Sequence, residues 1–192
     1  MRIVAGKYRG RHFDVPRTFK ARPTTDFAKE NLFNVLRSYI DFESDAPTAL
    51  DLFAGTGSIT LELLSRGCCR VTAVELDAQH VTFIRRFLHT LGSDAESDAL
   101  VLRADVLRFL QKTTASYDFI FADPPYALPD LEQLPDLIFD EGLRMNADGT
   151  RPALLAPDGL FVLEHGKTHD FSGHPHFVAH RAYGSVNFSF FQ

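Results

Sequence analysis

The sequence has few cysteines and no long hydrophobic segment. Its two cysteines, Cys68 and Cys69, are adjacent, a spacing that suits neither a disulfide framework nor a metal site. The longest apolar runs, residues 153–156 and 160–163, are far too short to span a membrane. No apolar signal-peptide core follows Arg2. These absences predict a cytoplasmic protein that has no membrane segment and binds no metal.

The chain concentrates its positive charge in its first residues. It has 192 residues, of which 45% are hydrophobic and 23% charged, as in an ordinary soluble domain. The net charge is −5, yet residues 1–37 hold nine Lys or Arg against three Asp or Glu. This segment therefore carries +6 and the remainder −11. A basic segment on an acidic body favours polyanion binding through that segment, although a solvated hairpin with scattered charges would give the same pattern.

Residues 1–43 are expected to form a small extension. Residues 2–15 alternate weakly between apolar and polar side chains around two glycines, which predicts a short β-hairpin. The Thr-Thr-Asp sequence at residues 24–26 can cap a following helix. The apolar stripe expected on that helix consists of Phe27, Leu32, Phe33, Leu36 and Ile40.

Residues 44–192 alternate between strand-like and helix-like segments. The expected strands are Ala49–Phe53, Val71–Glu75, Leu100–Leu102, Tyr117–Ala122, Leu160–Glu164, Phe177–Tyr183 and Val186–Phe191, and the expected helices are Ser58–Arg66, Asp77–Leu91 and Val106–Lys112. Strands that are apolar on both faces and alternate with helices predict a doubly wound, mostly parallel α/β sheet. The last two strands, joined at Gly184, are expected to form a hairpin that adds an antiparallel strand.

A glycine-rich turn follows the first of these strands. Residues 51–57 read Asp-Leu-Phe-Ala-Gly-Thr-Gly and lie at the carboxyl edge, where such sheets bind ligands. Gly55 and Gly57 allow a sharp bend and the close approach of a ligand. Glu75 ends the second strand, where an acid meets ribose hydroxyls, and Asp105 follows the third, where it can approach an adenine edge. Together they predict a nucleotide site.

The turn favours S-adenosylmethionine over NAD. An NAD site needs a third glycine three residues after Gly57, where this chain has Thr60. S-adenosylmethionine has no pyrophosphate and carries a cationic sulfonium, which suits the acidic Asp51 beside the turn. An NAD-dependent oxidoreductase is therefore disfavoured.

The fourth strand ends in Asp123-Pro124-Pro125-Tyr126, the most specific string in the chain. An exocyclic amine of a nucleobase is a poor nucleophile, because its lone pair is delocalised into the ring. The Asp123 carboxylate and the Pro124 carbonyl can each accept one N–H and so aim that lone pair at a sulfonium methyl. Prolines fix φ and remove competing donors, while Tyr126 offers a ring on which a flipped base can stack. The string predicts methylation of an amino group.

These motifs together resemble the class I amino-group methyltransferases. The opening Met-Arg-Ile-Val-Ala-Gly-Lys-Tyr-Arg-Gly-Arg, Arg-Pro-Thr-Thr-Asp at residues 22–26 and Leu-Phe-Asn-Val-Leu at residues 32–36 are similar to one family, the bacterial 16S ribosomal RNA guanine-N2 methyltransferases. The resemblance implies a seven-stranded Rossmann-like sheet with one antiparallel strand. It also implies S-adenosylmethionine as the donor and the N2 amino group of a guanine in small-subunit RNA as the acceptor.

The resemblance also implies roles for individual residues. Residues 1–43 become a basic RNA-contacting extension, and residues 44–192 become the S-adenosylmethionine-binding domain. The catalytic residues are Asp123, Pro124 and Tyr126; the cofactor-binding residues are Asp51, Phe53, Ala54, Gly55, Gly57, Glu75, Leu76, Asp105 and Val106; and the RNA-contacting residues are Arg9, Arg11, Arg22 and Tyr126. The partner is ribosomal RNA, either free or within an assembling small-subunit particle, and no obligate protein partner is expected.

Other functions share parts of this pattern. DNA methyltransferases acting on adenine N6 or cytosine N4 also use Asp-Pro-Pro-Tyr, but they usually need a recognition domain for which this extension has little room. Protein-glutamine methyltransferases carry a motif like Asn-Pro-Pro-Tyr, against which Asp123 counts. A non-catalytic binding module would keep the glycine turn without needing the Asp-Pro-Pro-Tyr string.

Overall fold

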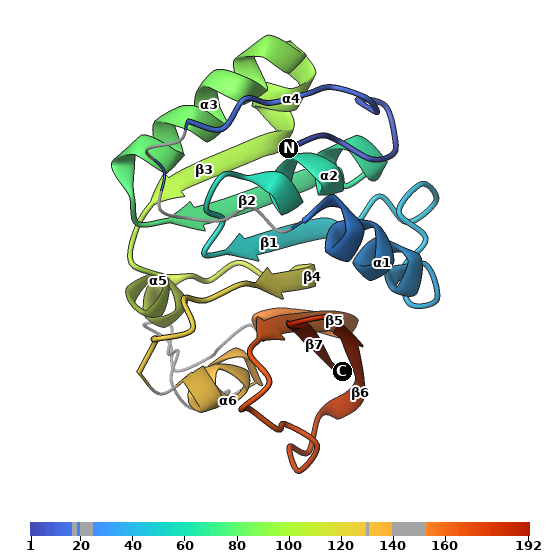
Figure 1. Cartoon of the computed structure of the whole chain (residues 1–192), viewed down its shortest axis with the longest axis vertical. Helices are drawn as coiled ribbons and strands as arrows, with labels where there is room; N and C mark the ends of the chain where they lie inside the picture. The colour runs from blue at the N-terminus through green and yellow to red at the C-terminus, as the bar shows by residue number, and fades with distance from the viewer. Residues whose placement is uncertain (17–18, 20–24, 130, 140–152) are drawn as a thin grey trace.

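A single central sheet with helices on both faces forms the body of the protein (Figure 1). The computed structural model describes residues 1–16, 19, 25–129, 131–139 and 153–192. The strands are β1 Thr48–Leu52, β2 Arg70–Glu75, β3 Ala99–Arg103, β4 Tyr117–Ala122, β5 Leu155–His165, β6 Phe177–Tyr183 and β7 Val186–Phe191. The helices are α1 Asp26–Leu36, α2 Ser58–Arg66, α3 Ala78–Leu91, α4 Ser93–Asp98, α5 Val106–Lys112, the 3₁₀ turn η1 Leu131–Gln133 and α6 Leu134–Phe139.

The strand order confirms the predicted topology. The seven strands run β3-β2-β1-β4-β5-β7-β6. Strands β1 to β5 pair in parallel, and β7 is antiparallel to both of its neighbours. The chain leaves β1 in one direction for β2 and β3, then returns on the other side of β1 as β4. Sheets of this kind bind ligands beyond the carboxyl ends of the strands at such a reversal, so the position between β1 and β4 marks the site.

Two apolar clusters cover the two faces of the sheet. Leu32 of α1, Leu61 of α2 and Ile84 of α3 belong to the cluster that contains Phe119 and Val162 of the sheet. Helices α5 and α6 contribute their buried side chains to the second cluster, on the opposite face. Because alternate residues of a strand point to opposite faces, cluster membership shows which way the polar residues at each strand end point.

The first residues of the chain are tied to α2 through a buried carboxylate. Glu62 is fully buried, and its two carboxylate oxygens accept hydrogen bonds from the backbone N–H groups of Val4 and Ala5 at 2.8 and 3.0 Å. Lys29 of α1 lies 3.5 Å from the same carboxylate, and Arg66 lies 2.9 Å from it. A buried charge is tolerated when it is paired and hydrogen-bonded, so Glu62 needs these partners.

The tip of this segment lies at the far end of α2 from the glycine turn. The Lys7 N–H donates to the Ser65 carbonyl at 2.7 Å, and the Lys7 ammonium lies 3.7 Å from Asp98 at the end of α4. A Cβ on Gly6 would lie only 1.7 Å from the Ser65 carbonyl oxygen, so the backbone approaches α2 as closely as glycine allows. In Figure 1 the bend formed by the first residues of the chain lies on the side of the sheet away from α5.

The structure bears out the short hairpin predicted for residues 2–15 and corrects the stripe predicted for the following helix. Arg2 forms an antiparallel bridge with His12, and backbone hydrogen bonds run from the Ile3 N–H to the Arg11 carbonyl and from the Phe13 N–H to the Met1 carbonyl, at 3.0 and 2.9 Å. The Val4 and Ala5 N–H groups bond to α2 instead. Phe27 was placed in the apolar stripe of α1 and is instead 67% exposed. Ile40 lies beyond the end of that helix, whereas Lys29, which the stripe left out, is buried.

Several elements were missing from the prediction or too short in it. The short helices α4 and α6 were not predicted, because six residues hold too little apolar periodicity to identify a helix. Strand β5 was expected at Leu160–Glu164 and begins at Leu155. Its first residues pass through a register shift opposite β4 and a positive φ of 61° at Asp158.

Candidate active site

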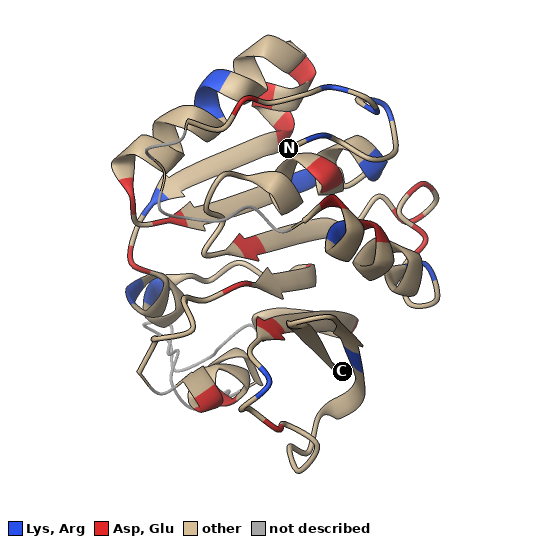
Figure 2. Ribbon diagram, viewed as in Figure 1, with Lys and Arg blue, Asp and Glu red and all other residues tan. Residues whose placement is uncertain are grey.

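Four carboxylates gather at the carboxyl edge of the sheet. Asp51 lies in β1, Glu75 ends β2, Asp123 follows β4, and Glu164 is next to last in β5. In each strand the residue two positions earlier belongs to the cluster covered by α1, α2 and α3, so all four side chains point to that face. Figure 2 shows acidic positions at the ends of several neighbouring strands. The arrangement concentrates acidic side chains where the strand order reverses.

Asp51 is held by the residue that replaces the missing third glycine. It is 1% exposed, and its Oδ2 accepts hydrogen bonds from both the backbone N–H and the hydroxyl of Thr60. Burial raises the pKa of Asp51 to about 7; the Thr60 hydrogen bonds oppose that rise, and Asp123 and Glu75 add to it. A nearby cation would stabilise the charged form of this carboxylate.

The glycine turn bends through three residues with positive φ. Phe53, Gly55 and Gly57 have φ values of 60°, 54° and 77°. A Cβ on Gly57 would lie 2.8 Å from Cγ1 of Ile84, so the residue must be glycine for space as well as for conformation. Gly57 also precedes α2 and supplies no side-chain cap to it. The turn, which includes Ala54, therefore presents its backbone groups at the edge of the sheet.

Glu75 joins the glycine turn to the start of α3. Its Oε2 accepts the Gly55 N–H and its Oε1 accepts the Asp77 N–H, both at 2.7 Å. The side chain is largely buried, and Nδ1 of His80 lies 3.7 Å from Oε1. That nitrogen is buried and has no hydrogen-bond partner among the described residues. Glu75 thus fixes the shape of the turn in addition to the ribose contact expected of it.

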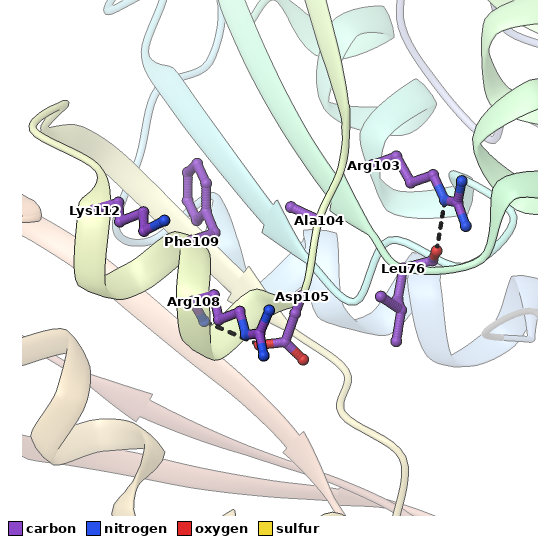
Figure 3. A pocket seen from close by; sticks show the side chains of 7 residues that line it. All are labelled: Leu76, Arg103, Ala104, Asp105, Arg108, Phe109 and Lys112. Carbon is purple, nitrogen blue, oxygen red and sulfur yellow. Dashed lines mark hydrogen bonds between the residues drawn. The ribbon is translucent and has the colours of Figure 1, made fainter.

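A cavity of about 580 Å³ lies beside the ends of β2 and β3 (Figure 3). It is lined by Leu76, Arg103, Ala104, Asp105, Arg108, Phe109 and Lys112. Leu76 is 61% exposed, and Asp105 caps α5 by accepting the Arg108 N–H at 3.0 Å. Val106 is buried in the second cluster, so its side chain faces the core and its backbone lies next to the cavity. The volume is in the range of small-molecule sites.

The Asp-Pro-Pro-Tyr string follows β4 directly. The Asp123 N–H donates to the Leu52 carbonyl at 3.3 Å, which fixes the string beside the end of β1. Burial raises the pKa of Asp123 to about 7. Pro124 is buried, whereas Pro125 and Tyr126 are exposed, and the Tyr126 ring is 58% exposed. An exposed aromatic ring next to a largely buried acid suits a flat ligand that enters from outside.

The sequence reasoning missed Glu164. Its strand was predicted, yet the residue was given no role because one acid after four apolar residues reads as the end of a strand. Glu164 is 4% exposed, and its Oε2 has no hydrogen-bond partner within the described part of the chain. Burial raises its pKa to about 9, with a further contribution from Asp123. Its position could have identified it, because it lies at the same edge of the sheet as Asp123 and on the neighbouring strand.

The expected RNA-contacting arginines lie away from these carboxylates. Arg9 and Arg11 are exposed and lie near the bend that packs against the end of α2, while Arg22 lies outside the described residues. From Gly57 to that end, α2 spans nine residues, or about 13 Å at 1.5 Å per residue. Arg103, Arg108 and Lys112 line the cavity, and Figure 2 shows basic positions on α5.

The chain matches one known protein family over its whole length. Residues 1–192 match the family described as conserved hypothetical protein 95. The chain belongs to this family. It is 38% identical to the ribosomal RNA small subunit methyltransferase D of Haemophilus influenzae, over 77% of this chain and 75% of that protein. The relatives in this family therefore include ribosomal RNA methyltransferases, and the chain has a methyltransferase fold.

Solved structures share the fold. A hypothetical protein of Thermus thermophilus superposes with a TM-score of 0.76 and 27% identity, over 100% of this chain and 99% of that one. The 16S rRNA N2 methyltransferase RsmC of T. thermophilus, in complex with AdoMet and guanosine, has a TM-score of 0.66 and 22% identity, covering 91% of this chain and 45% of that chain. At this identity the second likeness shows the fold alone.

Among the described residues, no group of three or more His, Cys, Asp or Glu side chains is placed to hold a metal ion. No helix in the described ranges is long and apolar enough to cross a membrane.

Proposed function

We propose that this protein transfers the methyl group of S-adenosylmethionine to the N2 amino group of a guanine in 16S ribosomal RNA. The observation that carries the proposal is the Asp-Pro-Pro-Tyr string at the end of β4, with Asp123 largely buried beside the glycine turn. The relatives named as small-subunit ribosomal RNA methyltransferases support RNA as the substrate. Guanine N2 as the acceptor is part of the proposal; the RsmC of T. thermophilus, which shares the fold, is named as an N2 methyltransferase in complex with AdoMet and guanosine.

The residues at the edge fit S-adenosylmethionine. This group supplies an electrophilic methyl on a cationic sulfonium. Asp51 and Asp123 place acidic side chains where a cation would stabilise their charged forms. Glu75, at the tip of β2, is positioned for the ribose hydroxyls, and Asp105 for the adenine edge. Phe53, Ala54, Gly55 and Gly57 contribute backbone contacts, and Leu76 and Val106 border the adenine.

Asp123 and Pro124 orient the amine. The Asp123 carboxylate and the Pro124 carbonyl each accept one hydrogen of the guanine N2 group, which turns its lone pair towards the methyl. When bound, S-adenosylmethionine would supply the electrophilic methyl and its sulfur would keep the electron pair of the bond that is given up. The N2 nitrogen would gain a positive charge with the methyl, and the Asp123 carboxylate would accept one of its protons. A pKa of about 7 suits Asp123 to accept and then release that proton near neutral pH.

Tyr126 and the basic extension hold the RNA. The exposed ring of Tyr126 stacks on the flipped base. Residues 1–43 act as the RNA-contacting extension of a methyltransferase domain over residues 44–192. Because the bend lies at the other end of α2, Arg9 and Arg11 contact phosphates at a distance from the target base. Arg22, which belongs to the same basic segment, is a further contact of this kind.

Mass spectrometry of nucleosides tests the proposal. The purified protein is incubated with labelled S-adenosylmethionine and three substrates: free 16S RNA, partly assembled small-subunit particles and duplex DNA. Labelled N2-methylguanosine from either RNA substrate is the expected product, and the comparison of the two identifies the physiological one. Labelled N6-methyladenine or N4-methylcytosine in DNA, with none in RNA, would overturn the proposal.

A further inference from the structure

Glu164 has a buried carboxyl oxygen without a partner. The residue is 4% exposed, and within the described residues nothing hydrogen-bonds its Oε2. Burying an unpaired polar group costs free energy, and such groups in folded proteins are rare. The register pairs Ala122 with Leu163, Asp123 and Glu164 are the residues that follow this pair, and Asp123 acts electrostatically on Glu164. The orphaned oxygen therefore lies next to the site proposed to hold the guanine N2 group.

The surroundings of Glu164 keep a proton on this pair of acids. The titratable groups that face it are Asp123 and Tyr126, and its neighbour on β7 is the apolar Phe188. In the described part of the chain no Lys or Arg forms an ion pair with either carboxyl group. Burial and Asp123 raise the pKa of Glu164 to about 9. Two adjacent acids do not both ionise readily, and Glu164 is the more deeply buried of the two, so near neutral pH the shared proton resides mainly on Glu164.

A neutral carboxyl group matches one edge of guanine. Next to the N2 amino group, guanine presents the N1–H donor and then the O6 acceptor. A neutral carboxylic acid has a carbonyl oxygen that accepts and a hydroxyl that donates, so it forms two parallel hydrogen bonds with N1–H and O6. The N2 hydrogens then remain free for Asp123 and Pro124. Adenine placed with its amine at the same point presents a bare N1 and a C–H, which offer at most one of these bonds.

We propose that Glu164 is the residue that identifies the target base, accepting the guanine N1–H and donating to O6 while Asp123 and Pro124 hold N2. This inference rests on the proposed function, since it assumes that a guanine occupies the site. Glu164 sets specificity, and the residues that orient the reacting nitrogen are separate from it.

The experiment uses an RNA that carries 2-aminopurine at the methylated position. The position is first mapped on the wild-type product, and the synthetic RNA then carries either guanine or 2-aminopurine there. 2-Aminopurine keeps the exocyclic amine but lacks N1–H and O6. The measured quantity is kcat/KM for each RNA with the wild type, Glu164→Ala, Glu164→Gln and a control, Glu132→Gln, which changes an exposed acid of η1.

The expected result is a change in base preference. Loss of two hydrogen bonds in a dry site should lower kcat/KM of Glu164→Ala on the guanine RNA by roughly 30-fold. Its value on the 2-aminopurine RNA should change only by about threefold, so the preference collapses. Glu164→Gln has the same donor and acceptor as the neutral acid and should stay within about threefold of the wild type on both RNAs. The control should match the wild type.

Two results would overturn the assignment. One is a guanine to 2-aminopurine ratio in Glu164→Ala that equals the wild-type ratio, which would make Glu164 a structural residue. The other is a Glu164→Gln variant as inactive as Glu164→Ala, which would show that an ionised carboxylate is required. Failure of the proposed function is distinct, because the wild type would then produce no N2-methylguanosine in the first place.

Discussion

Thr60 donates both its backbone N–H and its hydroxyl to the same oxygen of Asp51, Oδ2. Thr60 occupies the position where an NAD-binding chain needs its third glycine. The side chain that rules out close packing beside a pyrophosphate therefore also holds the carboxylate that suits a cation. One residue therefore underlies both arguments for S-adenosylmethionine as the proposed cofactor in place of NAD.

Replacing Thr60 with valine should weaken cofactor binding with little change in shape. The hydroxyl hydrogen bond lowers the pKa of Asp51, so its loss should raise that pKa further above 7. At pH 7 less of the carboxylate would be charged, and affinity for S-adenosylmethionine should fall several-fold and recover as the pH rises. Stability should fall by about 1 kcal/mol, the usual worth of one hydrogen bond. Calorimetry at pH 6, 7 and 8 checks this; an affinity that changes with pH as in the wild type would contradict it. NAD should bind neither protein.

The variant Glu75→Ala should bind the cofactor at least about tenfold more weakly. It removes a charged acceptor from the ribose hydroxyls, and hydrogen bonds to charged groups are worth roughly 1.5–3 kcal/mol. It also removes the acceptor of the Gly55 and Asp77 N–H groups, so the turn should loosen. Calorimetric titration measures the dissociation constant, with the exposed Glu30→Ala as the matched control. Equal constants in the two variants would assign Glu75 a structural role alone.

The variant Asp123→Ala should keep the fold and most of its cofactor affinity but lower turnover about 100-fold or more. That magnitude corresponds to losing one oriented polar contact at the reacting atom. The measurement is single-turnover methylation of 16S RNA together with S-adenosylmethionine affinity. Turnover within a few-fold of the wild type would show that Pro124 and the bound base orient the amine without Asp123.

The pH dependence of kcat/KM should be bell-shaped. Asp123 must be ionised to accept an N–H, so the rate should rise with pH through about 7, the raised pKa of that carboxyl group. Glu164 must keep its proton to donate to O6, so the rate should fall as the pH passes about 9. In Glu164→Gln the amide does not ionise, and the falling limb should disappear while the rising limb stays. A falling limb unchanged in that variant would assign it to another group.

Reversing the charges of Arg9 and Arg11 should weaken RNA binding and spare cofactor binding. Each lost phosphate contact should reduce the slope of log affinity against log salt by about 0.7–0.9. The loss should be the same for all RNA sequences, because phosphate contacts position a substrate without identifying it. Binding at several salt concentrations measures the slope, with Arg86→Glu on α3 as an exposed control. An unchanged slope with a lower melting temperature would make these arginines part of the packing on α2.

The parts of the site that could be predicted from sequence are those with local signatures. The chemistry of the glycine turn with Thr60, and that of the Asp-Pro-Pro-Tyr string, can each be recognised from a few neighbouring residues. Glu164 has no such signature, since its importance comes from the register of β5 against β4, which the sequence does not display. Phe27 was misplaced because a helix stripe read from spacing does not show which end of the helix projects beyond the core.

The position of the basic extension relative to the active site could not be predicted from the sequence either. Nothing in the spacing of Arg9 and Arg11 indicates at which end of α2 the bend packs, because that depends on Glu62 and Ser65, more than 50 residues away. The charge pattern therefore predicted a basic segment but not how far that segment lies from the target base.

The buried carboxylate of Glu62 also constrains the order in which the chain becomes native. Its partners are the N–H groups of Val4 and Ala5, which leave the ribosome long before α2 does. These N–H groups remain hydrogen-bonded to water until Arg66 has been synthesised and the helix that carries Glu62 can form. These residues thus reach their final contacts only after α2 has formed, and an extension transplanted from a relative would need the matching acid on the host helix to dock at all.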